Sequence, residues 1–204
     1  MKKYFLILVL IPFLLTTSAV YGAEKVLIGN GNIALKMDYL HFTENALDDL
    51  DNADCFYVGL EAYNKITSNL YVGMEIGYAT SDGSAQVVNT ELQRVNSDTE
   101  LTFVPIELNL KYAIDITPRL VVDFGAGFSY NWMKEDISGP GISSPGDDWL
   151  WGGQFFAALN YKIDRFFIGI NGKYQLTEDF EIKDNETDVN ANNWRIGGQV
   201  GIMF

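Results

Sequence analysis

The chain has 204 residues, which suits one domain, and its formal net charge is −13. An acidic chain of this kind lacks the basic face that nucleic-acid binding requires, so no nucleic-acid partner is expected. The single cysteine excludes an internal disulfide. Beyond the N-terminal region, no apolar run reaches the roughly 20 residues of a membrane-spanning helix, but short strands that are apolar at every second position could still span.

Residues 1–23 have the pattern of a secretory signal peptide. Two lysines begin the segment, an apolar run follows, and small residues end it. We expect cleavage after Gly22, with cleavage after Ala23 as the alternative. An uncleaved membrane anchor is disfavoured because the apolar run is shorter than the ~20 residues that a spanning helix needs. The mature domain, residues 24–204, then carries a formal charge of about −15, because both lysines are removed.

Residues 33–42 begin a pattern that the rest of the chain repeats. Ile33, Leu35 and Met37 share one phase, and Ala34 lies on the other. Alternation with a period of two is the signature of a β-strand with one apolar face. Eight such segments follow one another, near residues 33–42, 56–63, 70–78, 104–112, 120–130, 151–161, 166–175 and 194–204.

The connections between these segments alternate in length. Short ones lie near residues 64–69, 113–119 and 162–165, and long polar ones lie near 43–54, 81–100, 131–148 and 177–192. Tight periplasmic turns that alternate with long outer loops are typical of an all-β, eight-stranded antiparallel up-and-down transmembrane β-barrel. The even number of strands places both ends of the barrel on the periplasmic side.

The apolar phase is predicted to face lipid, because aromatic residues mark both of its ends. Tyr and Trp rings settle at headgroup depth, so two such girdles suit a membrane barrel. The outer girdle comprises Tyr39, Tyr78, Tyr130, Trp151, Tyr174 and Trp194, and the inner one Tyr112, Tyr161, Phe166 and Phe204. The alternative is a soluble, lipocalin-like carrier with the apolar phase turned inward.

The opposite phase mixes glycine with charges of both signs. Side chains fill the interior of an eight-stranded barrel, and opposite charges there can pair, which makes their burial tolerable. We therefore expect a structural set of lumen charges, namely Lys36, Asp38, Glu61, Glu75, Glu107, Lys111, Asp123, Lys173 and Arg195.

The last alternating segment ends on Phe204. A terminal aromatic on such a strand resembles the C-terminal signature of outer-membrane proteins. Residues 104–112 resemble a strand that the same proteins carry in mid-chain, and over about residues 30–204 the chain resembles the outer-membrane β-barrel family of OmpA transmembrane domains and OmpX-like proteins. This resemblance implies a Gram-negative outer-membrane location after export through the periplasm, and recognition of Phe204 by the outer-membrane assembly machinery.

The sequence offers no convincing catalytic, cofactor or metal site. His41 is the only histidine, with Thr43 and Glu44 nearby, but a nucleophile, a base and an orienting group are not all evident. Acidic clusters in the long loops allow weak divalent-cation binding as a hypothesis, and a solvated anionic surface is favoured over it.

The expected function is non-enzymatic, with a structural or surface-interaction role in the cell envelope. The expected partners are outer-membrane lipid and lipopolysaccharide, the assembly machinery, and an extracellular ligand of the loops. Two alternatives remain open: a small pore, which the narrow charged lumen disfavours, and a lipid-modifying outer-membrane enzyme.

Overall fold

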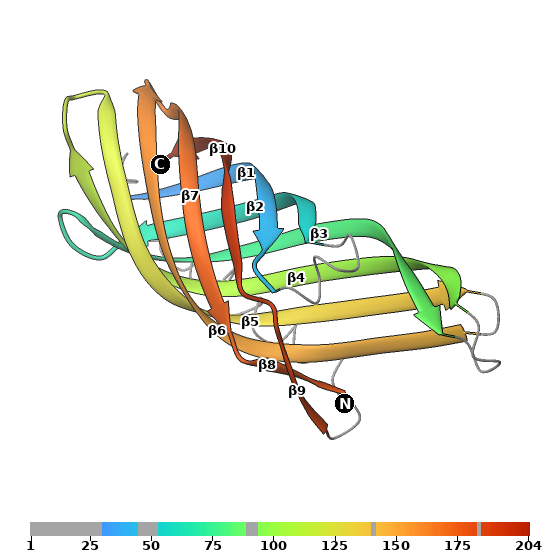
Figure 1. Cartoon of the computed structure of the whole chain (residues 1–204). Coiled ribbons are helices and arrows are strands. Elements are labelled where there is room, and N and C mark those ends of the chain that lie inside the picture. Colours follow the sequence, from blue (N-terminus) through green and yellow to red (C-terminus); the bar gives the residue numbers. More distant parts are fainter. Residues whose placement is uncertain (1–29, 45–52, 89–93, 140–141, 183–184) are drawn as a thin grey trace.

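A computed structural model describes residues 30–44, 53–88, 94–139, 142–182 and 185–204 of the chain (Figure 1). The predicted signal peptide, residues 1–23, lies outside these ranges. Every regular element in the described ranges is a strand. No helix among the described residues is long and apolar enough to cross a membrane.

Eight strands close into one antiparallel barrel, which confirms the predicted fold class. Around the barrel the order is β1, β10, β7, β6, β5, β4, β3 and β2, so neighbours in the sequence are neighbours in space. The strands are β1 (Gly31–Phe42), β2 (Asp54–Lys65), β3 (Leu70–Val88), β4 (Arg94–Asp115), β5 (Leu120–Gly139), β6 (Ile142–Ile163), β7 (Phe166–Thr177) and β10 (Asn193–Met203). A separate hairpin pairs β8 (Asp179–Ile182) with β9 (Asn185–Asn190).

The three connections predicted to be short are tight turns at one end of the barrel. The turn between β2 and β3 is closed by a hydrogen bond from the Ile66 amide to the Leu70 carbonyl, at 2.8 Å. The turn between β6 and β7 contains Asp164 at a φ of 56°, a left-handed conformation that a short polar side chain tolerates. At the same end, Gly31 and Phe204 exchange backbone hydrogen bonds of 2.9 and 3.0 Å, which join the first strand to the last.

Three of the predicted long loops, 81–100, 131–148 and 177–192, are wrong, because strands occupy most of them; the last contains β8 and β9. Strands β3 to β6 continue past the barrel wall as a four-stranded extension, which reaches the lower right of Figure 1. Ser81 pairs with Leu101, and Val88 pairs with Arg94, within the range predicted as loop 81–100. The sequence of the extension, for example residues 81–88 and 94–100, lacks the regular apolar alternation that identifies a half-buried strand.

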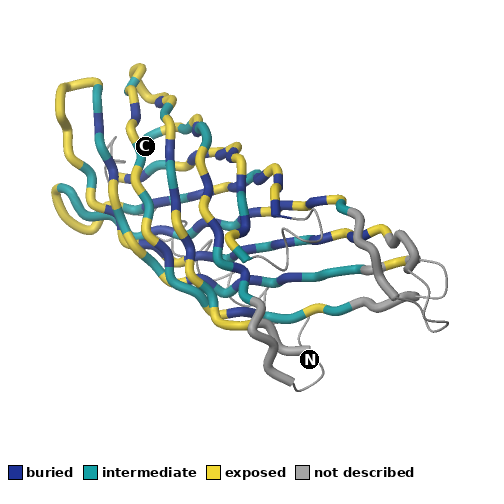
Figure 2. Tube along the Cα trace, viewed as in Figure 1, coloured by how far each residue is buried: buried dark blue, intermediate teal, exposed yellow. Residues whose placement is uncertain are grey.

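Burial alternates along the strands, as Figure 2 shows by its succession of dark and light segments. In β1 the inward positions are buried, and the outward positions from Ile33 to Tyr39 are exposed. The same phase relation holds on both neighbours of β1, because Tyr39 pairs with Phe56 on β2 and with Ile196 on β10. The apolar phase therefore forms the outer wall, and the polar phase fills the lumen.

Candidate functional site

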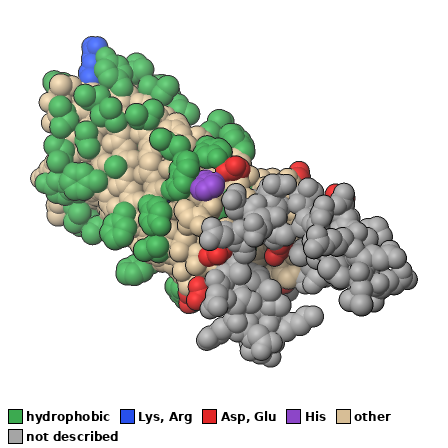
Figure 3. All heavy atoms as spheres, viewed as in Figure 1, with side chains coloured by type: hydrophobic (Ala, Val, Ile, Leu, Met, Phe, Trp, Pro, Cys, Tyr) green, Lys and Arg blue, Asp and Glu red, His purple; other side chains and the backbone are tan. Residues whose placement is uncertain are grey.

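The outer wall of the barrel is apolar over its middle band. Phe128 has 74% of its surface exposed, and Phe155 and Ile170 are similarly open. Green hydrophobic side chains cover this band in Figure 3. A continuous exposed apolar band cannot face water at tolerable cost, since exposed patches on soluble monomers are far smaller. The wall therefore faces hydrocarbon.

Aromatic rings gather at the two edges of this wall. At the end opposite the turns, Tyr130 stacks on Trp149 with a centroid separation of 4.5 Å and contacts Trp151 at 4.6 Å. At the turn end, Tyr112 lies 5.6 Å from Phe124. These positions match the two predicted girdles, and they bound the segment that lies in the membrane.

All nine predicted lumen charges are buried inside the barrel. Five of them make a compact centre, in which two carboxylates face three cations. Glu75 accepts hydrogen bonds from Lys36 at 3.1 Å and from Lys173 at 2.7 Å. Glu107 pairs with Lys173 and accepts a 2.6 Å bond from Arg195. Each carboxylate thus meets at least two cations, which offsets the loss of its hydration.

The other four lumen charges pair more loosely. Lys111 and Asp123 are 3.6 Å apart, while Lys36 reaches back to Glu61 at 3.8 Å. Asp38 accepts a 2.9 Å hydrogen bond from Asn171 and makes no ion pair within the described residues. In formal charge the nine groups comprise five acids and four bases.

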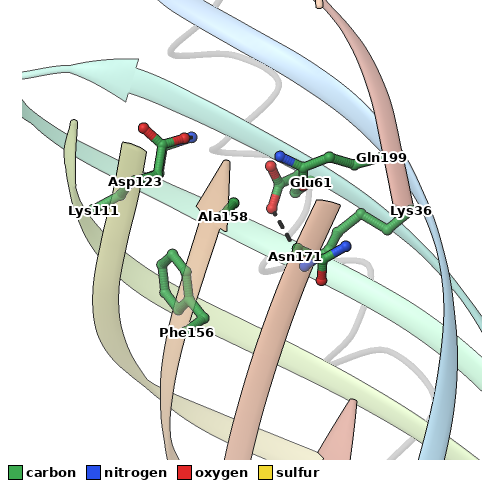
Figure 4. A pocket seen from close by; sticks show the side chains of 8 residues that line it. All are labelled: Lys36, Glu61, Lys111, Asp123, Phe156, Ala158, Asn171 and Gln199. Atoms are coloured by element: carbon green, nitrogen blue, oxygen red, sulfur yellow. Dashed lines mark ion pairs between the residues drawn. The ribbon is translucent and has the colours of Figure 1, made fainter. Parts of the chain in front are cut away.

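A small polar cavity lies among these looser pairs (Figure 4). Its volume, measured over the centres of water-sized spheres, is about 10 Å³, which suits a single water molecule. Side chains from seven strands converge on it, including Asn171, whose buried Oδ1 has no hydrogen-bond partner in the described part of the chain. The cavity is far too small for an organic substrate, and it interrupts the lumen packing only locally.

The outward half of the lumen is filled by apolar side chains rather than charges. We call this group the apolar cap; it comprises Leu40, Phe42, Cys55, Tyr57, Ala79, Leu101, Phe103, Met133, Leu150 and Ala191. At its centre Phe42 meets Phe103 edge to face, at 5.4 Å and 87°. The cap differs from the polar interior that the alternating pattern predicts. The available signal was the loss of alternation at strand ends, where residues 39–42 are aromatic or apolar at both phases.

Tyr57 joins the cap to the charged centre. Its hydroxyl donates a 2.6 Å hydrogen bond to Glu75, and its ring lies 4.6 Å from the Arg195 guanidinium carbon. Gly59 and Gly77 make room for the ring, because a methyl group at either position would overlap it. The lumen is therefore packed continuously from the cap to the charged centre.

His41 lies on the outer face of the barrel, near the rim opposite the turns (Figure 3). Its Nδ1 is 2.7 Å from Asp54, and the same carboxylate oxygen accepts a hydrogen bond from Tyr39. These hydrogen bonds, Tyr39 first and His41 second, lower the pKa of the Asp54 carboxyl. The sequence had suggested Thr43 and Glu44 as neighbours, and it missed Asp54 because that residue is on the adjacent strand.

This rim cluster lacks a nucleophile among the described residues. The hydroxyl of Thr43 donates to the Asn192 carbonyl at 3.2 Å, so it is not directed at His41. Within the described ranges no group of three or more His, Cys, Asp or Glu side chains could hold a metal ion. The acidic cluster of the first long loop includes Asp48, Asp49 and Asp51, which lie outside those ranges.

A closed antiparallel barrel with an apolar outer wall, aromatic girdles and a filled polar lumen is a transmembrane β-barrel. The chain belongs to the outer membrane protein beta-barrel domain family, whose model matches residues 7–197. The predicted family and outer-membrane location are thus confirmed.

Solved structures show the same fold at low sequence identity. Neisserial surface protein A (NspA) matches with a TM-score of 0.60 and 11% identity, over 87% of this chain and 99% of that one. Ail, the attachment invasion locus protein of Yersinia pestis, was crystallised with the heparin analogue sucrose octasulfate. It matches with a TM-score of 0.54 and 12% identity, over 86% of this chain and 100% of that one. No curated protein sequence matches the chain.

Proposed function

We propose that this chain is a sealed, non-enzymatic barrel that contributes to the structure of the outer membrane and presents its outer end for surface contacts. The observation that carries the proposal is the double closure of the lumen. The apolar cap fills the outward half, and paired charges fill the middle. A solute that crossed the lumen would have to displace both, so a transport role is disfavoured.

Efflux from vesicles tests the absence of a pore. Proteoliposomes loaded with a small neutral sugar should release it no faster than protein-free vesicles, while a general porin provides the positive control. Rapid release by the folded, heat-modifiable protein would overturn the proposal and favour the small-pore alternative. A control sample that has been boiled and not refolded separates pore activity from damage to the bilayer.

The cluster of His41, Asp54 and Tyr39 at the rim allows a test of the proposal that the chain is not an enzyme. A His–Asp pair orients an imidazole, but acyl or peptide hydrolysis also needs a nucleophile and a stabilised oxyanion. We expect His41→Ala to leave the lipid A profile of a Gram-negative host unchanged relative to the unmodified chain. A product that appears with the unmodified chain and disappears with His41→Ala would establish an enzyme.

The outer end of the barrel is acidic, whereas a surface that binds polyanions has to be basic. Among the described side chains beyond the outer girdle, eleven Asp and Glu residues accompany one lysine, Lys134. We therefore expect no retention on immobilised heparin at physiological salt, in contrast to the complex that Ail forms with a heparin analogue. Salt-sensitive retention would show that this surface binds polyanions after all.

A further inference from the structure

The charges on the two ends of the barrel are opposite in sign. On the face seen in Figure 3, basic side chains lie at the turn end of the apolar wall, and acidic ones lie toward the other end. The described turn-end residues comprise four cations, Lys65, Arg119, Lys162 and Arg165, and two acids, Asp115 and Asp164. At the other end the acids exceed the bases by eleven to one.

Each of the three tight turns presents a basic side chain. Lys65 precedes the first turn, Arg119 lies in the second, and Arg165 lies in the third. All three are exposed, and none of them makes an ion pair within the described part of the chain. Lys162 differs, because it pairs with Asp115 at 2.6 Å. The turns therefore spread three uncompensated cations around the barrel rim.

The three cations lie at the turn end of the barrel, where the inner aromatic girdle marks the depth at which lipid headgroups begin. Arg119 Nη1 donates a 3.4 Å hydrogen bond to the hydroxyl of Tyr161, a half-exposed girdle residue. Lys65 pairs with Tyr71 across β2 and β3, and its Nζ is 5.9 Å from the Tyr71 ring centre, at the turn-end mouth of the lumen. A girdle ring such as Tyr161 settles at the interface, so Arg119 is held next to the apolar wall rather than extended into solvent.

We propose that Lys65, Arg119 and Arg165 bind the phosphate groups of anionic phospholipids in the leaflet at the turn end. Two observations select this partner. The basic groups are exposed at the rim where the lipid-facing wall ends, so the lipids that coat the wall bring their headgroups close to them. Their charge is complementary to phosphate, and Arg offers a planar fork of donors that matches its oxygens.

Lipid retention measures the preference directly. The refolded mature chain is placed in vesicles of phosphatidylcholine and phosphatidylglycerol, released gently into detergent, and its bound lipids are counted by native mass spectrometry. Phosphatidylglycerol should be enriched over its bulk fraction, and the enrichment should fall with salt. One cation near an anionic leaflet contributes ~1 kcal/mol, so each site should raise the preference about fivefold.

The triple variant Lys65→Gln, Arg119→Gln, Arg165→Gln should lose the enrichment while remaining heat-modifiable. The matched control is Lys134→Gln, which removes a cation that is paired with Asp136 at the opposite end and should change nothing. A wild-type chain without enrichment, or a triple variant that keeps it, would overturn the proposal. Displacement of the bound lipid by soluble glycerol phosphate would also overturn the proposal, because the site would then bind free phosphate rather than a phospholipid in the membrane.

Discussion

The two halves of the lumen are closed by different interactions, apolar packing in one and ion pairing in the other. In the outward half, the apolar cap excludes water by packing, with Phe42 against Phe103 at its centre. In the middle, Glu75 and Glu107 are held by three cations at hydrogen-bond distance. Packing tolerates exchanges of similar volume, whereas a buried charge network fails when one partner is removed. The two halves should therefore respond differently to substitution.

The largest effect is expected in the charged centre. Arg195→Leu removes the cation that pairs with Glu107 and leaves a buried carboxylate with less compensation. We expect the free energy of unfolding to fall by about 4 kcal/mol. Urea unfolding in lipid vesicles, followed by the gel shift between folded and unfolded forms, measures it. The control Lys134→Gln should lie within about 0.5 kcal/mol of the unmodified chain, and a similar value for Arg195→Leu would contradict the role of the network.

The apolar cap should be the next most sensitive region. Phe103 is fully buried, so Phe103→Ala leaves a cavity and should cost about 3 kcal/mol in the same unfolding assay. Phe103→Leu keeps most of the volume and should cost about 1 kcal/mol. Equal losses for both variants would show that the cap is not packed as described.

Gly77, at the junction between the halves, can be compared with Gly153, a strand glycine with open space around it. A methyl group at Gly77 would overlap the Tyr57 ring, whereas the nearest atom to a methyl group at Gly153 is 3.8 Å away. We expect Gly77→Ala to cost about 2 kcal/mol and Gly153→Ala less than about 0.5 kcal/mol. If Gly153→Ala costs as much, backbone effects rather than the contact with Tyr57 control the junction.

The smallest effect lies outside both halves, at the rim. Tyr39→Phe removes the first of two hydrogen bonds that lower the pKa of Asp54, so that pKa should rise toward its ordinary value. Because the pKa is lowered in the folded chain, the stabilisation is present above the ordinary pKa and is lost as pH falls through the lowered one. A carboxyl-detected NMR titration measures the change, and an unaltered Asp54 pKa would show that the Tyr39 bond does not form.

The membrane part of this fold could be predicted from the sequence because lipid imposes a strict period of two. The first strand shows it clearly from Ile33 to Tyr39, where exposed and buried positions alternate without interruption. Where the chain leaves the membrane the constraint ends, and the extension of β3 to β6 was mistaken for loops. The strands there are held by backbone pairing, for example of Ser81 with Leu101, and the hydropathy pattern of the sequence does not show such pairing.

For the candidate sites, the positions of the residues could be predicted from the sequence, but their interaction partners could not. The nine lumen charges could be named from their phase alone, because each lies at an inward position of a regular strand. The partners could not be named, since Lys173 and Glu107 are 66 residues apart and come together only through the curvature of the barrel. The pair of His41 and Asp54 was missed for the same reason: it depends on the register between β1 and β2.

Single-channel recording tests the sealed lumen most directly. The folded, heat-modifiable chain is inserted into a planar bilayer, and current is recorded at both polarities in concentrated salt. Closure by the apolar cap and by the paired charges predicts no unitary conductance steps. Steady steps whose size rises with salt concentration would show a continuous water path through the barrel and would contradict the account.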